Sequence, residues 1–268
     1  MPLLRLPEPY DFALSTERLR AFGADLANLW HEGGLHRVVR GREVRIESAP
    51  GGVDVDPLDA EIEPVVRKLL GLSFDLPAFT AFAAGNPHVA GLAHRLRGFR
   101  PLLVPDPFEM LVGSIVSQQV SLFSAFAIRN RLVERFGERA EHAYAFPTRE
   151  RLASAQEDEL LALGFSRRKV EYVLGLARGD FDLDALAALP DGEVKQRLVA
   201  VRGLGEWSTD WYLARHLGRP EAWPAGDLVL RRTVEALYRD EDARAAGRHF
   251  APFQNLSAHY LLLGLRTP

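Results

Sequence analysis

Residues 198–209 read LVAVRGLGEWST, and this stretch predicts a tight turn between two helices. An apolar helix runs into Gly203-Leu204-Gly205, and a new helical pattern begins immediately afterwards. Glycines on both sides of one apolar residue let the backbone turn with positive φ. Leu204 can then pack inward, while the amides of the turn and of the second helix face outward. Such a group of N–H donors binds a phosphate without any lysine.

A second stretch adds a carboxylate. Residues 223–234 read WPAGDLVLRRTV, which places Asp227 in a loop marked by proline and glycine, directly before a predicted helix. An aspartate in that position is most often the N-cap of the helix, because its side chain accepts hydrogen bonds from the first free amides. The same position also suits a carboxylate that acts on a bound ligand. The local pattern leaves both interpretations open.

The hairpin and the Gly/Pro…Asp segment together resemble the signature of the helix-hairpin-helix superfamily of base-excision DNA glycosylases. Residues 107–121, PFEMLVGSIVSQQVS, look like the helix and the Gln-Gln loop of the same family. The resemblance covers residues 100–265. Residues 10–85 resemble the additional domain of the alkylbase DNA glycosylase II branch, the AlkA-like 3-methyladenine DNA glycosylases. The implied fold is mainly α: a helix-hairpin-helix DNA glycosylase fold with a small N-terminal α/β domain.

The resemblance implies a catalytic carboxylate and an aromatic base pocket. Asp227 is the acid at the family's catalytic position, where its charge would stabilise the oxocarbenium-like sugar as the base departs. The damaged nucleotide must first leave the duplex. Because an electron-poor base favours electron-rich rings, the pocket residues at matching positions are Trp207, Trp211, Gln118 and Phe253. Phe253 departs from the tryptophan of the branch, which leaves the breadth of substrates open.

The resemblance also implies DNA contacts at the hairpin and at the Gln-Gln loop. Gln119 matches the residue that fills the gap left by the flipped base, although the branch's prototype has an apolar wedge there. The remaining implied DNA contacts are Gly203, Leu204, Gly205 and Ser208. In the family, a monovalent cation, Na⁺ or K⁺, bridges to a phosphate from the backbone carbonyls at the positions of Val199, Val201 and Leu204. The resemblance implies no other cofactor.

Patterns in the rest of the chain predict two domains. Residues 35–56 alternate between apolar and charged side chains, which predicts a strand, a turn at 50–52 and a second strand. Helices are predicted from Asp59 to Gly71, and from a cap at Ser15 through residue 29. From residue 76 onward only helical patterns recur, at 76–84, 107–118, 122–136, 149–163, 167–177, 192–201, 206–217, 229–238 and 255–265. We therefore predict an N-terminal α/β domain over residues 1–85 and an all-helical domain over residues 86–268, with the helix-hairpin-helix at about 198–217.

Composition excludes several other chemistries. The 268 residues contain no cysteine, so disulfides, thiolate nucleophiles and thiolate-held iron–sulfur clusters are excluded. The eight histidines show no HExxH spacing and no cluster with acids that matches a metal site.

The net charge of −3 argues against a nucleic-acid binder. The backbone amides of the hairpin answer this objection, because they can bind phosphate locally. The arginine-rich run 129–135 is interpreted either as a solvated helix face or as a phosphate contact.

No stretch has the roughly 18 consecutive apolar residues of a membrane span, and the N-terminus lacks the pattern of a secretory signal. We expect a cytoplasmic, nucleoid-associated monomer that binds double-stranded DNA with alkylated bases.

The expected function is that of a monofunctional DNA glycosylase, which excises alkylated purines, chiefly 3-methyladenine, and leaves an abasic site. Two alternatives remain: a non-catalytic helix-hairpin-helix DNA-binding protein, and a glycosylase for oxidised, mismatched or deaminated bases. Asp227 and the tryptophans argue against the first alternative. Bifunctional members of the superfamily carry a lysine two residues after the second hairpin glycine, and this chain has Trp207 there.

Overall fold

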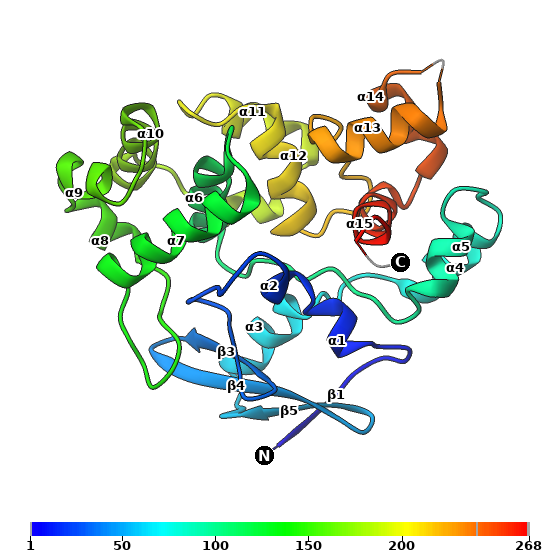
Figure 1. Cartoon of the computed structure of the whole chain (residues 1–268), viewed down its shortest axis with the longest axis horizontal. Coiled ribbons are helices and arrows are strands. Elements are labelled where there is room, and N and C mark those ends of the chain that lie inside the picture. The colour runs from blue at the N-terminus through cyan, green and yellow to red at the C-terminus, as the bar shows by residue number, and fades with distance from the viewer. Residues whose placement is uncertain (1, 240, 267–268) are drawn as a thin grey trace.

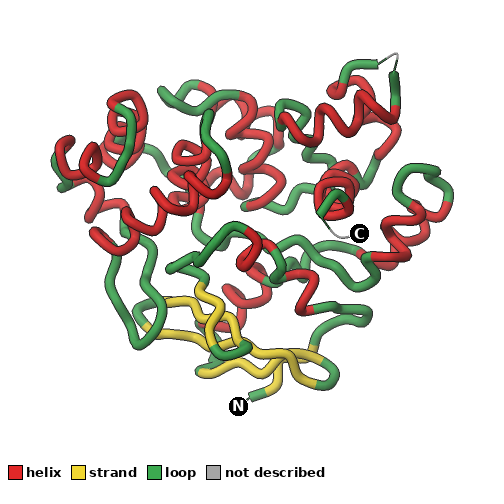
Figure 2. The backbone as a smooth tube through the Cα atoms, viewed as in Figure 1, coloured by secondary structure: helices red, strands yellow, loops and turns green. Residues whose placement is uncertain are grey.

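In the computed structural model, which describes residues 2–239 and 241–266, a small β-sheet lies at one end and helices form the rest (Figures 1 and 2). The sheet is antiparallel and five-stranded, with the order β1-β5-β4-β3-β2. Its strands are β1 Leu3–Arg5, β2 Leu29–His31, β3 Gly34–Val39, β4 Arg42–Ala49 and β5 Gly52–Asp56. The predicted mainly α fold with a small N-terminal α/β domain is confirmed.

The segment predicted as strand, turn and strand forms three strands instead of two. Arg40 and Gly41, between β3 and β4, both have positive φ and turn the chain. Ile46 of β4 pairs with Leu35 of β3 and with Val55 of β5. All three side chains are fully buried. The alternation of apolar and charged residues therefore does place one face of the sheet in a core. Only the turn at Arg40 and Gly41 was not predicted.

The helix predicted from a cap at Ser15 is wrong. The chain instead forms two short helices, α1 Phe12–Ser15 and α2 Arg18–Ala21, and residue 29 begins β2. The backbone leaves the helical region at Gly23, whose φ of +98° separates the first apolar residues of the pattern from the later ones. The helix predicted from residue 59 is confirmed as α3 Ile62–Leu69, which packs against the sheet.

The helical part follows the predicted pattern with one break. Its elements are α4 Leu76–Ala84, α5 Ala90–Arg95, α6 Pro107–Ser117, α7 Leu122–Phe136, α8 Arg149–Ala153, α9 Glu157–Ala162, α10 Arg167–Arg178, η1 Asp184–Ala188, α11 Asp191–Val199, α12 Glu206–Arg215, α13 Leu228–Leu237, α14 Ala243–Ala246, η2 Gly247–Phe250 and α15 Gln254–Gly264. The predicted helix 149–163 is divided because the N–H of Gln156 donates to Glu159 Oε2 at 3.0 Å and starts α9. Four elements, α5, η1, α14 and η2, were not predicted; each spans only four to six residues, too few for a period to stand out. Within the described residues, no helix combines the length and the apolar character of a membrane span.

Three clusters of buried apolar side chains hold these elements together. One lies between the sheet and α3, and a second joins helices α6 to α12. The third combines α4 with α13, α14 and α15. The domain boundary at residue 85 stays a prediction, although α4, on its N-terminal side, packs with the C-terminal helices.

A buried group of ions joins the sheet to the helices. Glu109 on α6 accepts hydrogen bonds from Arg37 of β3 (Nη2 to Oε2, 2.5 Å) and from Arg129 of α7 (Nη2 to Oε1, 2.6 Å). Arg129 also donates to Asp25, in the loop before β2. We call these four residues the Glu109 network. Arg129 belongs to the run predicted as a solvated face or a phosphate contact, and the structure shows it as an internal ion-pair partner instead.

Candidate active site

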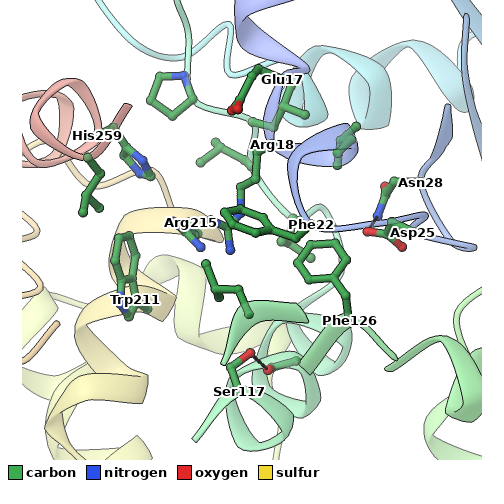
Figure 3. A pocket seen from close by; sticks show the side chains of 18 of the residues that line it. Glu17, Arg18, Phe22, Asp25, Asn28, Ser117, Phe126, Trp211, Arg215 and His259 are labelled. Atoms are coloured by element: carbon green, nitrogen blue, oxygen red, sulfur yellow. Dashed lines mark hydrogen bonds between the residues drawn. The ribbon is translucent and has the colours of Figure 1, made fainter. Parts of the chain in front are cut away.

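A cavity of about 440 Å³ opens between the N-terminal helices and the helices α6, α7, α12, α13 and α15 (Figure 3). Three residues predicted from the sequence, Trp207, Trp211 and Asp227, line this cavity together. It lies directly beside the hairpin, because Trp207 is in the first turn of α12. We call this cavity the pocket.

Asp227 is both an N-cap and a pocket residue. Its Oδ1 accepts hydrogen bonds from the N–H groups of Val229 and Leu230, each at 3.1 Å, and so begins α13. Its Oδ2 accepts no hydrogen bond within the described residues. The side chain is half-buried and borders the pocket. The two interpretations that the sequence left open are therefore compatible, since capping orients the carboxylate and leaves one oxygen free.

Helix α12 supplies one wall of the pocket. Trp211 is 3% exposed and Trp207 is half-buried. Arg215 follows one turn later, and its Cζ lies 3.9 Å from the centroid of the Trp211 ring. His259 of α15 adds a ring whose centroid is 5.6 Å from that of Trp211. This wall therefore combines flat aromatic faces with a cation stacked on one of them.

Two arginines reach into the pocket, Arg18 from α2 and Arg215 from α12 (Figure 3). Neither guanidinium donates a hydrogen bond within the described residues. Burial and the neighbouring Arg266 lower the pKa of Arg18 to about 10, while Asp227 partly opposes the shift. Burial, reinforced by Arg18, also lowers the pKa of Arg215 well below its ordinary value. The pocket thus offers several N–H donors that lack a protein acceptor.

His259 completes this set with a neutral imidazole. Burial, with the nearby cations Arg215, Arg18 and Arg266, holds the pKa of His259 well below its ordinary value. Its Nε2 is buried and has no hydrogen-bond partner among the residues that the structure describes. A ligand with polar edges can therefore find partners on this side of the pocket.

The Gln-Gln loop follows α6, and its two glutamines differ in position. Gln118 Nε2 donates to the carbonyl of Gly203 at 2.8 Å and lies 3.4 Å from Ser208 Oγ. Gln118 therefore braces the hairpin, and it is not among the residues that line the pocket. Gln119 is exposed with φ +55°, next to the exposed Val120. The loop thus presents a polar side chain at an exposed tip.

Phe253 lies away from the pocket, contrary to its predicted place. Its ring packs against Phe82 and Phe79, with centroid distances of 5.3 and 5.9 Å, in the core formed with α4. It stands at the start of α15, and the pocket is lined instead by residues further along this helix, including His259 and Leu262.

The predicted hairpin joins α11 to α12. Leu204 is buried in the helical core at 4% exposure. Gly203 has φ +94°, and a Cβ there would overlap the ring of Tyr172. Gly205 has extended backbone, with φ −109° and ψ −175°, and open space around its Cα. Only the first glycine is therefore required by the turn, which corrects the expectation of positive φ at both. Ser208 is buried at 1% exposure, so the outward donors are the backbone amides that begin α12.

This difference between the glycines yields a prediction for DNA binding. Gly205→Val should leave the stability of the protein unchanged, because the site is extended and open, and it should obstruct a phosphate at the amides of α12. We expect affinity for abasic-site DNA to fall about tenfold for all sequences alike, as when a charge-assisted hydrogen bond is lost. Gly192→Val, in open space at the far end of α11, is the matched control. Equal affinities of the two variants in fluorescence anisotropy would remove the hairpin from the interface.

Sequence reasoning missed Arg18, Phe22, Phe126, Arg215 and His259. Only Arg215 had a local signal, since it lies four residues after Trp211 and eight after Trp207, on one helix face. The others come from elements that are distant along the chain, and no spacing links them.

Residues 112–251, which include most of α6, the hairpin and Asp227, match the family model described as HhH-GPD superfamily base excision DNA repair protein. The match covers more than half of the chain. The chain belongs to the HhH-GPD superfamily. A DNA-3-methyladenine glycosylase of Bacillus subtilis is 29% identical to this HhH-GPD protein over 185 residues, which are 66% of this chain and 61% of that protein. The chain thus matches about three fifths of the length of this relative.

Two solved structures extend the similarity of this HhH-GPD chain. The 3-methyladenine DNA glycosylase from Archaeoglobus fulgidus has a TM-score of 0.89 and 25% identity, and the match covers 100% of this chain and 99% of that one. The 3-methyladenine DNA glycosylase of Schizosaccharomyces pombe, in complex with abasic DNA, has a TM-score of 0.58 and 25% identity over 69% of this chain and 94% of that one. The full coverage of the first match includes the N-terminal sheet.

Proposed function

We propose that this HhH-GPD protein is a monofunctional DNA glycosylase that flips alkylated purines, 3-methyladenine and related bases, out of double-stranded DNA and excises them. The product is an abasic site, as in base excision repair. One observation carries the proposal: the capped carboxylate of Asp227 keeps one oxygen free at a pocket lined by Trp207 and Trp211. The names of the similar proteins from Bacillus subtilis and Archaeoglobus fulgidus support the same activity.

The proposed chemistry follows from the charges in the pocket. An alkylated purine carries positive charge, so its glycosidic bond is already weakened. As the base departs, positive charge develops on the sugar, and the fixed carboxylate of Asp227 stabilises it. Water then adds at C1′ and loses a proton, which leaves the abasic site and the free base. Trp207 and Trp211 offer faces on which a flat base stacks. A pocket with these groups has no role in a protein that only binds DNA, which argues against the non-catalytic alternative.

Identification of the released bases tests the proposal. The protein is incubated with methylated genomic DNA, and free bases are identified by mass spectrometry. We expect 3-methyladenine and related purines among the released bases. DNA binding with no released base would support the non-catalytic alternative and reject the proposed function.

The arginines in the pocket should govern which purines are preferred. Arg18 and Arg215 repel a cationic base, yet each can donate to a base carbonyl such as that of hypoxanthine. Arg18→Met should therefore raise the ratio of 3-methyladenine to hypoxanthine excision by about tenfold or more, since a hydrogen bond to a charged group contributes roughly 1.5–3 kcal/mol. Arg20→Met, on the same helix but outside the pocket, is the control. An unchanged ratio measured on duplexes with single lesions would contradict this role.

We also expect that the enzyme has no β-lyase activity. Such activity needs an amine that attacks C1′ as a Schiff-base nucleophile. The three lysines are all in the described part of the chain, and none lines the pocket. Lys195 Nζ is bound to Asp210 Oδ1 at 2.6 Å, and Lys169 Nζ to the carbonyl of Val116 at 2.7 Å. Borohydride treatment on DNA with methylated, oxidised or abasic sites should trap no covalent adduct. An adduct in good yield would favour a glycosylase for oxidised bases.

We further propose that the hairpin holds Na⁺ or K⁺ through the carbonyls of Val199, Val201 and Leu204. The residues fit such an ion, because the carbonyl oxygens of Val199 and Leu204 are available to it. Within the described part of the chain, neither oxygen accepts a backbone hydrogen bond other than any bond inside its own helix. That of Val201 accepts one, from Leu204 at 3.0 Å, and keeps a second lone pair. The ion would supply positive charge for a DNA phosphate. No other cofactor is proposed for the excision reaction. The protein is proposed to act as a monomer on the DNA of the cytoplasmic nucleoid.

A further inference from the structure

Three histidines and a glutamate gather where the sheet meets the loop between α7 and α8. His31 ends β2, His36 lies in β3, Glu43 lies in β4, and His142 belongs to the loop. The ring centroid of His142 is 4.6 Å from that of His31 and 5.1 Å from that of His36. The rings of His31 and His36 are 5.6 Å apart. None of these residues lines the pocket. We call them the histidine cluster.

The carboxylate of Glu43 is held in a fixed orientation. Its Oε2 accepts hydrogen bonds from the backbone N–H groups of His142 (2.8 Å) and Ala143 (3.1 Å). Its Oε1 lies 2.7 Å from Nδ1 of His36 and 3.2 Å from Nδ1 of His142. One carboxylate oxygen is therefore anchored by the loop, while the other faces two imidazole nitrogens at once.

His36 is buried with only one of its two ring nitrogens partnered. The residue is 4% exposed, and within the described part of the chain its Nε2 has no hydrogen-bond partner. A buried imidazole with one unsatisfied nitrogen is unfavourable. The contact of Nδ1 with Glu43 Oε1 offsets part of this cost. A metal ion bound at Nδ1 would offset more of it.

The ligand atoms are close enough for one ion. One atom from each of His36, Glu43 and His142 lies within 4.8 Å of the other two. Ligands of tetrahedral zinc, with bonds of about 2.0–2.2 Å, lie roughly 3.3 Å apart. The distances from Glu43 Oε1 to the two Nδ1 atoms, 2.7 and 3.2 Å, need only a small opening to reach this value. Imidazole nitrogens favour Zn²⁺ over Mg²⁺ or Ca²⁺, which prefer oxygen ligands alone.

We propose that His36, Glu43 and His142 bind a zinc ion, with His31 or water at the fourth position. The site is structural: it connects two strands of the sheet to a loop of the helical part, about a hundred residues away along the chain. The backbone bonds to Glu43 Oε2 act as the outer partners that orient a metal ligand. The inference is independent of the proposed glycosylase activity, because the cluster does not border the pocket.

Metal binding to the intact 268-residue chain tests the proposal. Chelator-treated protein is titrated with Co²⁺, whose visible absorption reports tetrahedral coordination, and with Zn²⁺ in competition with a chromophoric chelator. We expect one equivalent of either ion, release of protons on binding, and a Tm that rises with added Zn²⁺. His142→Ala should lower the affinity for Zn²⁺ at least about a hundredfold, more than the loss usually caused by an outer-shell change.

Two further variants keep the test decisive. His94→Ala, on the exposed face of α5, is the matched control and should bind metal like the parent protein. His36→Gln should abolish binding even if it is less stable, and circular dichroism at low temperature verifies that each variant is folded. The proposal is overturned if the parent protein binds no stoichiometric zinc. It is equally overturned if folded His142→Ala binds zinc as tightly as His94→Ala does.

Discussion

Asp227→Asn is expected to lower base excision at least a hundredfold while changing DNA affinity only a few-fold. Asparagine caps a helix about as well as aspartate, so the hydrogen bonds to Val229 and Leu230 that begin α13 should persist. The charge that is proposed to stabilise the departing sugar is lost, and removal of one preorganised electrostatic group typically costs about 10²–10³ in rate. The proposed DNA contacts at the hairpin are untouched. Single-turnover excision and fluorescence anisotropy measure the two effects separately.

Asp242→Asn supplies a control of the same chemistry. Asp242 caps α14 through hydrogen bonds from the N–H groups of Arg244 and Ala245, and it does not line the pocket. The Asp242→Asn variant should therefore retain full excision activity. A nearly normal rate for Asp227→Asn would remove Asp227 from the catalytic role. Equal losses in both variants would show that the loss of excision is not specific to the charge at the pocket.

Glu109→Gln should destabilise the protein by about 3–5 kcal/mol, the loss usual when one partner is removed from a buried ion pair. The side chain of Glu109 is 3% exposed, and that of Arg37 is 8% exposed. Glutamine keeps the shape of the side chain, so no cavity contributes to the loss. It leaves the guanidinium groups of Arg37 and Arg129 without their shared countercharge. Urea denaturation measures the difference.

Glu159→Gln is the matched control, because its partner Arg135 is 56% exposed. An exposed ion pair contributes only about 0–1 kcal/mol. A loss for Glu109→Gln no larger than that of the control would show that the Glu109 network does not stabilise the junction of sheet and helices.

The same network predicts a loss of stability in acid. Burial opposes the charge of Glu109, but Arg37 and Arg129 outweigh burial and hold the pKa of Glu109 below its ordinary value of 4.5. Asp25 behaves likewise beside Arg129, with its pKa below 3.8. A carboxylate with a lowered pKa stabilises the folded state above the ordinary value, and this contribution is lost as pH falls through the lowered pKa. The unfolding free energy should therefore decrease below about pH 4.5, and less steeply in Glu109→Gln.

The elements that carry the glycosylase signature were predictable because their signals are local. The turn at Gly203, the inward Leu204 and the capping position of Asp227 depend on residues a few positions apart. The helices of the C-terminal part follow from the 3.6-residue period of their apolar side chains, and the alternation of β4 and β5 follows from the two-residue period of a strand. Where the local pattern was ambiguous, as at Arg40 and Gly41, one turn was enough to change the number of strands.

The composition of the pocket and of the histidine cluster was decided only by the tertiary structure. Arg18 and Arg215 meet in one cavity although they are 197 positions apart, and His36 and His142 meet across 106. Phe253 was placed in the pocket by analogy, but its position at the start of α15 directs it into the core beside α4. The period of the apolar side chains along an element indicates which of its faces is buried. It does not indicate which other element covers that face. The packing of the helices on the sheet therefore decides which charges surround Asp227. It also decides that Glu43 and the histidines of the histidine cluster come close together.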